Sequence, residues 1–182
     1  MFALSTGPTG RIFAFDALPQ NAAITKHNAR LNRLSNIIVR PVGLGEHPGP
    51  KWASFQNGNS VVTRNAREDA VEIELSRLDD EIPADIHVDF LKIDVEGHEL
   101  EVLRGARRVL SGRPVIDLEL HNFIHYGIPL QEIRQTLMDL DYCFYVQETP
   151  HDIPRGPFLD LDFVDVSARS NPHIFCVSRL AK

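Results

Sequence analysis

Residues 88–112 limit what this chain can fold into more than any other segment. The stretch VDFLKI is an apolar strand pattern, and Asp94-Val95-Glu96-Gly97 follows it directly. A helical pattern begins at once and continues to Gly112. Two carboxylates, Asp94 and Glu96, therefore lie where a buried strand gives way to a helix. In open α/β sheets this carboxyl end of a strand is where ligands bind.

The helix predicted after Gly97 has signals at both of its ends. Leu100, Leu103 and Leu110 recur at helical spacing, with acidic residues in the first turns and arginines in the later ones. This charge order matches the helix dipole. Gly112 is placed as a C-cap. The pattern predicts one continuous helix that ends at residues 111–112.

Strand and helix patterns alternate through most of the chain. The remaining strands are predicted at residues 11–15, 36–40, 52–55, 70–75, 115–120, 142–146 and 174–177, with helices at 19–32 and from 129 onward. Ile24, Leu31 and Leu34 are expected to form the apolar face of the first helix. Residues 43–60 otherwise indicate loop, as does the proline-rich segment 147–173. The alternation predicts one α/β domain over residues 1–182, with a mostly parallel, doubly wound sheet and an antiparallel C-terminal end.

Composition narrows the class of protein. The chain has 182 residues, 43% of them hydrophobic and 24% charged, which is typical of one globular domain. A net charge of -6 without a Lys/Arg run argues against a nucleic-acid partner. The apolar runs are shorter than the ~18 residues of a membrane span, and the first residues lack the charged flank of a signal peptide. We therefore expect no membrane partner and a cytoplasmic location, with Cys143 and Cys176 as two buried, reduced thiols and no metal site.

Two further places could carry chemistry. Asp16 ends the first strand and precedes a helix, where an acid binds ribose hydroxyls in doubly wound nucleotide folds, although a turn or N-cap role is common for an Asp before a proline. Glu119 and His121 end the strand at 115–120 and would approach Asp94 if the two strands are neighbours. Such a group could bind a metal ion or serve in acid–base chemistry, or could be a satisfied structural cluster.

We expect different surroundings for Asp94 and Glu96. The strand before Asp94 is apolar on both faces, so we expect Asp94 to lie deep in the sheet beside a partner group. Glu96 is open to a purely structural interpretation, as a first-turn helix acid stabilised by the helix dipole.

Two segments of the sequence resemble the FkbM family of S-adenosylmethionine-dependent methyltransferases. DFLKIDVEGHELEVLRGA carries the more specific match, an I-D-V-E-G core followed by E-x-x-x-L-x-G-A. RIFAFDALPQNAAITKHNARLN is similar to the family's F-E-P-x-P-x-N segment, with Asp16 in place of Glu. The resemblance extends over most of residues 7–146.

The resemblance implies a Rossmann-like methyltransferase fold and methyl transfer, often to a hydroxyl of a sugar or other small molecule. It implies that Asp16, Asp94 and Glu96 contact the cofactor S-adenosylmethionine. It also implies that Asp94, Glu119 and His121 line the catalytic cleft.

The sequence differs from the family pattern at its N-terminal end. The family begins with a strand that ends in an Asp-x-Gly-Ala-x-x-Gly loop and leads into a helix. Residues 1–5 resemble only the end of that helix, so we expect a fold that lacks the first strand and most of the first helix. The strands that end at Asp16 and Asp94 would then keep open hydrogen-bonding edges. We expect weak or no activity from the chain alone.

Two other functions remain open on sequence grounds. The chain could be a non-catalytic remnant that binds a partner through its acidic cleft. It could also be a dinucleotide-dependent oxidoreductase, because Asp16 suits any adenosine ribose, although the segment from Asp94 to Ala106 disfavours this.

Overall fold

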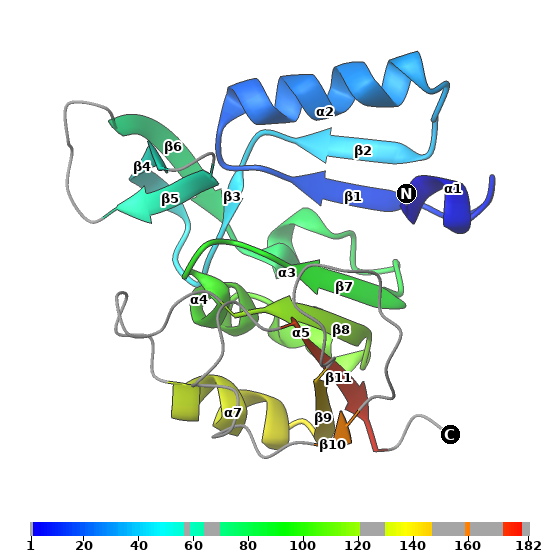
Figure 1. Ribbon diagram of the computed structural model, residues 1–182, viewed down its shortest axis with the longest axis vertical. Helices are drawn as coiled ribbons and strands as arrows, with labels where there is room; N and C mark the ends of the chain where they lie inside the picture. The colour runs from blue at the N-terminus through cyan, green and yellow to red at the C-terminus, as the bar shows by residue number, and fades with distance from the viewer. Residues whose placement is uncertain are drawn as a thin grey trace. The chain divides into compact units, whose positions relative to one another are not determined.

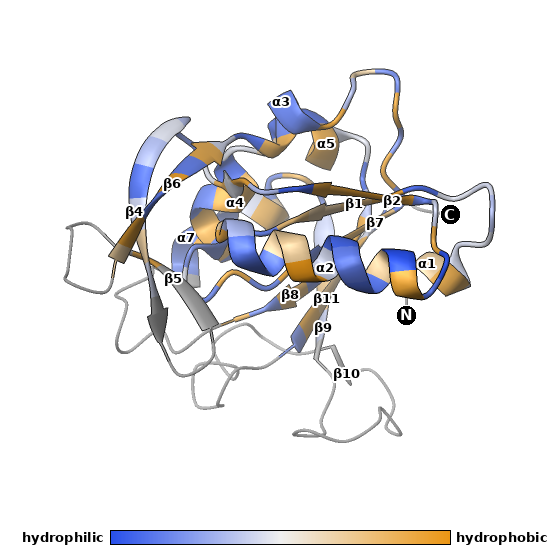
Figure 2. Ribbon diagram, turned by 90° about the horizontal axis from the view of Figure 1, so that it is seen from above, coloured by the Kyte–Doolittle hydropathy of each residue, from blue (hydrophilic) through white to orange (hydrophobic). Residues whose placement is uncertain are grey.

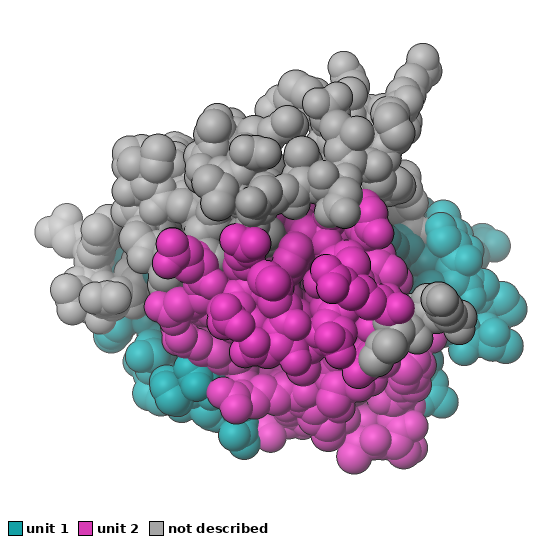
Figure 3. Space-filling view, turned by 90° about the horizontal axis from the view of Figure 1, so that it is seen from below, with its two compact units in different colours: residues 1–77 teal, residues 78–182 magenta. Residues whose placement is uncertain are grey.

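A computed structural model describes residues 2–56, 59–63, 70–120, 130–146, 159–160 and 173–179. The chain divides into two compact units, Met1–Arg77 and Leu78–Lys182 (Figure 3), and each is described by itself. The expected single-domain organisation stays a prediction. No helix within these ranges is both long enough and apolar enough to cross a membrane.

Unit 1 begins with a strand–helix–strand segment. After the short helix α1 (Phe2–Ser5), β1 (Ile12–Phe15), α2 (Pro19–Leu31) and β2 (Ile37–Arg40) follow in order (Figure 1). β1 and β2 pair in parallel, with Ile12 opposite Ile37. Pro19 starts α2, where a missing N–H costs nothing. The predicted parallel unit and the helical end at residues 2–5 are both confirmed.

The predicted apolar face of α2 is wrong. Ile24 and Leu31 are exposed, whereas Ala22 and Ala29 are the buried residues of this helix. At about 100° per residue, a side chain two positions from an alanine lies on nearly the opposite face. Small alanines face inward here, and the larger apolar side chains do not.

A second sheet of unit 1 occupies a segment for which loop was predicted. It contains β3 (Gly43–Leu44), β4 (Gly49–Gln56), β5 (Asn59–Thr63) and β6 (Ala70–Ser76), in the order β3-β6-β4-β5. The short strand expected at 52–55 lies within β4 and is confirmed, whereas the loop expected over the rest of residues 43–60 is wrong. β4 pairs antiparallel with both β5 and β6, so its backbone partners override its Gly and Pro content.

Strand β6 follows most of its predicted pattern. Ile73 and Leu75 are buried and pack in one cluster with Leu18 and Ala53, while the side chains between them face outward. The strand predicted at residues 70–75 is confirmed, but Val71, which alternates with Ile73 and Leu75, is exposed. This cluster is the hydrophobic core of the described part of unit 1.

Unit 2 is built on a five-stranded sheet in the order β10-β9-β11-β8-β7. Its strands are β7 (Phe90–Ile93), β8 (Val115–Glu119), β9 (Tyr142–Val146), β10 (Leu159–Asp160) and β11 (His173–Ser178). β7 and β8 are parallel, and every other pair in this sheet is antiparallel. The predicted antiparallel end is confirmed, but β10 lies in a segment expected to be loop. Within the described residues β7 forms the edge of its sheet, and β1 pairs only with β2.

The single helix predicted for residues 98–111 is two helices, α4 (Glu99–Arg104) and α5 (Arg107–Ser111). Asp79 of α3 (Leu78–Glu81) explains the break. Its carboxylate accepts hydrogen bonds from the backbone N–H groups of Arg108 and Val109, at 2.7 and 2.9 Å. A cap supplied from another element satisfies the free N–H groups of a new helix start. The sequence pattern of residues 98–111 contains no sign of it.

The sheet of unit 2 has one apolar face. Ile93, Ile116, Leu118 and Ile174 alternate along three strands and are almost completely buried. The helices α4, α5 and α7 (Leu130–Met138) add buried side chains to the same core, including Leu103, Leu110, Ile133 and Leu137. Figure 2 shows β7 and β8 coloured mainly as hydrophobic. Because side chains alternate between the faces of a strand, the residues between these apolar positions lie on the other face.

Candidate active site

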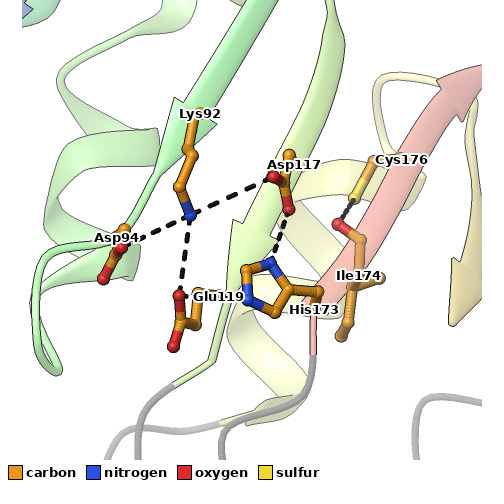
Figure 4. A network of polar contacts seen from close by, with 7 residues as sticks. All are labelled: Lys92, Asp94, Asp117, Glu119, His173, Ile174 and Cys176. Atoms are coloured by element: carbon orange, nitrogen blue, oxygen red, sulfur yellow. Dashed lines mark hydrogen bonds and ion pairs between the residues drawn. The ribbon is translucent and has the colours of Figure 1, made fainter. Parts of the chain in front are cut away.

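Five charged or titratable side chains gather on that other face, at the carboxyl ends of β7 and β8 (Figure 4). The carboxyl-end cluster consists of Lys92, Asp94, Asp117, Glu119 and His173. The strand register explains the gathering, because Lys92 lies opposite Asp117 and His173 lies opposite Glu119. Three strands that are distant in sequence therefore present their polar residues to one place.

Lys92 is the centre of the cluster. Its Nζ lies 3.3 Å from Asp94 Oδ2, 3.5 Å from Glu119 Oε2 and 4.0 Å from Asp117 Oδ2. Carboxylates so close to one another repel, and the ammonium group between them offsets that repulsion. Lys92 thus allows three acids to share one end of the sheet.

His173 closes the other side of the cluster. Its Nδ1 lies 3.0 Å from Asp117 Oδ1, and its Nε2 lies 3.2 Å from Glu119 Oε2. The side chain of Asp117 is 11% exposed and that of Glu119 is 19% exposed, whereas His173 is 42% exposed. The imidazole therefore lies between two sheltered carboxylates and keeps an accessible side.

The expected deep burial of Asp94 is wrong. Its side chain is 39% exposed, and within the described residues β7 is the edge strand of its sheet, where Phe90 is exposed as well. The expected partner is present in Lys92. β7 and β8 are neighbours as anticipated, and Asp94 and Glu119 approach each other through the ammonium group of Lys92.

A tight turn connects β7 to α4. Glu96 and Gly97 both have positive φ, 52° and 96°, in the left-handed region that residues other than Gly rarely adopt. The N–H of Gly97 donates a hydrogen bond to Oε1 of Glu99, whose side chain is fully buried. Glu96 precedes α4 rather than lying in its first turn, so the first-turn interpretation of Glu96 is wrong.

Asp16 has a clear local role in unit 1. Its Oδ1 accepts a hydrogen bond from the N–H of Leu18 at 2.9 Å, just before α2 begins. The turn interpretation is thereby confirmed. Oδ2 of Asp16 makes no hydrogen bond or ion pair with the part of the chain that the structure describes. A carboxylate oxygen at the end of β1 fits the ribose position of a nucleotide cofactor, and that role stays a prediction.

Sequence reasoning missed three members of the carboxyl-end cluster, namely Lys92, Asp117 and His173. His121, which was expected there, lies outside the described residues. Lys92 and Asp117 could have been found from the alternation K-x-D and D-x-E along β7 and β8. His173 had no local signal, because only the pairing of β11 with β8 brings it to Glu119.

The two cysteines are both free thiols. Cys176 is buried as expected, and this burial, with the charge of Asp117 as a smaller cause, raises the pKa of its thiol well above the ordinary range. Cys143 is only half-buried, and its sulfur accepts a hydrogen bond from Nε of Arg179. Within the described ranges, no three His, Cys, Asp or Glu side chains are arranged to hold a metal ion.

Comparison with known proteins shows which family the sequence matches. The sequence model of the methyltransferase FkbM domain matches residues 1–144. The chain is 27% identical over 123 residues to "Methyltransferase 1" of Beauveria bassiana (strain ARSEF 2860), a match that covers 54% of this chain and 49% of that protein. This chain thus spans about half the length of the curated relative that it matches.

A solved structure confirms the architecture. The crystal structure of methyltransferase FkbM from Methylobacillus flagellatus KT aligns with a TM-score of 0.61 at 21% identity, over 96% of this chain and 38% of that chain. The Rossmann-like methyltransferase fold is therefore confirmed. With the family model matching most of its length, the chain belongs to the methyltransferase FkbM domain family.

Proposed function

We propose that this protein is an S-adenosylmethionine-dependent methyltransferase that acts on a hydroxyl group of a small molecule or sugar. One observation carries the proposal: in an FkbM domain, Asp94 and Glu119 lie within 3.5 Å of the same Lys92 ammonium at the carboxyl ends of two parallel strands. That end of a parallel sheet is where open α/β folds bind ligands.

Asp16, Asp94 and Glu96 are the proposed cofactor residues. Asp16 fits the ribose because one of its oxygens caps a turn while the other points to no partner within the described ranges. When bound, S-adenosylmethionine supplies an electrophilic methyl group, and the residues of this chain orient the donor and the acceptor.

The catalytic contribution lies mainly in alignment. Methyl transfer needs the acceptor oxygen, the methyl carbon and the sulfur in line, and positioning alone supplies much of the rate. A hydroxyl acceptor also has to lose a proton, which a nearby carboxylate can receive. Asp94 and Glu119 are the proposed groups, with His121 as a further candidate.

A binding module without catalysis is the second candidate. Lys92, Asp94 and Glu119 are already engaged with one another, which is how a purely structural ion-pair network is arranged. In that case ligands would bind at the cluster with no turnover.

Calorimetry with S-adenosylhomocysteine and with NAD tests the proposal. We expect S-adenosylhomocysteine to bind and NAD not to bind, and binding of NAD alone would overturn the methyltransferase assignment. Incubation with S-adenosylmethionine and a panel of sugars, read as release of S-adenosylhomocysteine, then separates an enzyme from a binding module.

Asp94→Asn sharpens this test. We expect this variant to lose turnover more than cofactor affinity, because the amide keeps the shape of the side chain but cannot accept a proton. Asp85→Asn is the matched control, since Asp85 is an exposed acid of the same unit outside the cluster. Equal turnover of the two variants would remove Asp94 from the mechanism.

A further inference from the structure

His173 has an unusual pair of contacts for a surface-accessible histidine. Both of its ring nitrogens face carboxylates, Nδ1 that of Asp117 at 3.0 Å and Nε2 that of Glu119 at 3.2 Å. A neutral imidazole has one N–H and can donate to only one of them. The second contact becomes a hydrogen bond only when the ring takes up another proton.

The two carboxylates differ in their surroundings. Asp117 is the more sheltered, and it lies on the central strand of the three that form the cluster. A sheltered carboxylate that accepts from Nδ1–H fixes both the tautomer and the orientation of the ring, as an acid does for a catalytic histidine in other enzymes. The lone pair of Nε2 is then directed to the side where Glu119 lies.

We propose that His173 receives the proton directly in methyl transfer, that Asp117 is its positioning residue, and that Asp94 and Glu119 act through the charges they place around it. The proposal rests on the proposed function. As the acceptor oxygen forms its bond to the methyl carbon, the carbon–sulfur bond breaks and its electron pair goes to sulfur. The hydroxyl proton moves to Nε2 of His173 when the hydroxyl takes the place of Glu119 beside that nitrogen, and the imidazolium ion keeps its Nδ1–H bond to Asp117.

The neighbouring charges suit this role. From β8, Asp117 and Glu119 each face one of the two ring nitrogens. From β7, Lys92 contacts the same two carboxylates and balances part of their charge, and Asp94 balances Lys92 from the other side. Cys176 of β11 lies on the opposite, apolar face of the sheet with Ile174, and burial raises the pKa of its thiol, so it remains neutral.

The tautomer of His173 gives a test that needs no acceptor substrate. We would label the full chain with ¹⁵N-histidine and assign the His173 resonances with His173→Asn. We expect the neutral ring to carry its proton on Nδ1, and Asp117→Asn to shift that proton toward Nε2. A neutral ring protonated on Nε2 in the unaltered protein would overturn the proposal.

Turnover gives the second test. In His173→Asn, the side-chain amide can still donate to Asp117 from the position of Nδ1, while the proton-accepting Nε2 is lost. We expect the turnover that the unaltered protein shows, weak as it is expected to be for the chain alone, to fall roughly 10²-fold, with the dissociation constant of S-adenosylhomocysteine unchanged. Turnover equal to that of the unaltered protein would overturn the proposal.

His87→Gln is the matched control, because His87 is an exposed histidine of the same unit whose only ion pair within the described residues is with Asp89. This variant should keep full turnover and the tautomer of His173. If the unaltered protein binds no S-adenosylhomocysteine, the proposed function fails and the methyl-transfer role with it. The tautomer would still report separately whether Asp117 orients His173.

Discussion

The backbone N–H of Gly97 donates a hydrogen bond to Oε1 of Glu99 across 3.0 Å, and the Glu99 side chain has no exposed surface. This bond ties the turn that follows β7 to the first residue of α4. It supports a backbone in which Glu96 has a φ of 52°, a conformation that costs a residue with a Cβ about 1–2 kcal/mol. The acids at the end of β7 therefore depend on a buried side chain of the next helix.

Glu99→Ala should lower the free energy of unfolding by roughly 1–3 kcal/mol, because the N–H of Gly97 loses its acceptor in a buried place. Glu99→Gln keeps an acceptor oxygen, so its free energy of unfolding should fall by less than that of Glu99→Ala. Urea denaturation followed by circular dichroism measures both. Glu101→Gln is the control, since Glu101 makes a half-exposed pair with Arg104 that is worth at most about 1 kcal/mol. Equal stability of Glu99→Ala and the unaltered protein would show that the bond does not support the turn.

Replacing Glu96 by Asn separates its backbone role from its proposed contact with the cofactor. Asn adopts the left-handed region more readily than Glu, so Glu96→Asn should keep or slightly raise the melting temperature. If Glu96 contacts the cofactor, the same variant should bind S-adenosylhomocysteine more weakly in calorimetry. An unchanged dissociation constant would remove Glu96 from the cofactor site.

Asp16 can be tested in the same way through its two oxygens. Asp16→Asn keeps an oxygen that can accept from the N–H of Leu18, whereas Asp16→Ala loses this turn bond and about 1 kcal/mol of stability. We expect Asp16→Asn to fold normally and to bind S-adenosylhomocysteine about tenfold more weakly, because a charged hydrogen bond to the ribose is lost. Unaltered affinity in Asp16→Asn would refute the ribose assignment.

The buried hydroxyl of Tyr142 should make the folded protein less stable at high pH. Its hydroxyl donates to the carbonyl of Pro114 at 2.9 Å, and burial raises the pKa of Tyr142 to about 12. The unfolded chain releases this proton near pH 10 and the folded chain does so near 12. The contribution of the protonated Tyr142 hydroxyl to the free energy of unfolding is therefore fully present below pH 10 and is lost as the pH rises from 10 to 12.

Urea denaturation at pH 8 and at pH 11 measures this loss. Tyr142→Phe should be less stable than the unaltered protein at pH 8, by about 1 kcal/mol for the missing hydrogen bond. The difference between the two proteins should shrink by pH 11. A constant difference across this range would contradict the assignment.

The two thiols should differ in reactivity. Burial raises the pKa of the Cys176 thiol, and a buried, protonated thiol is a poor nucleophile. Cys143 is half-buried and should react first with a thiol reagent at pH 8. Mass spectrometry of the native protein should show one labelled cysteine, and two after unfolding in guanidinium chloride. Labelling of Cys176 first would contradict the burial seen in the structure.

Local patterns in the sequence predicted much of the fold. The parallel strands β1, β2, β7 and β8 were predicted from apolar runs, and α2 from its helical pattern and Pro19. These elements depend on periodicity and end signals within about a dozen residues, which a sequence contains. The antiparallel end followed from the absence of a helix between the last two strands.

The errors have a common physical reason. β4 forms in a segment rich in Gly and Pro because β5 and β6 pair with it, and α5 begins where Asp79 caps it from α3. β6 pairs with β4 from more than a dozen residues further along the chain, and Asp79 lies 29 residues before Arg108. Propensity is a weak prior where such partners exist.

The sequence by itself determined the family motif, the strand that ends at Asp94 and the two acids of that turn, because all of these lie within one continuous segment. Only the tertiary structure decided that Lys92 lies among three carboxylates and that His173 faces Asp117 and Glu119. Those contacts depend on the register between β7, β8 and β11. Register is fixed by burying one apolar face of the whole sheet, which no single segment of the sequence specifies.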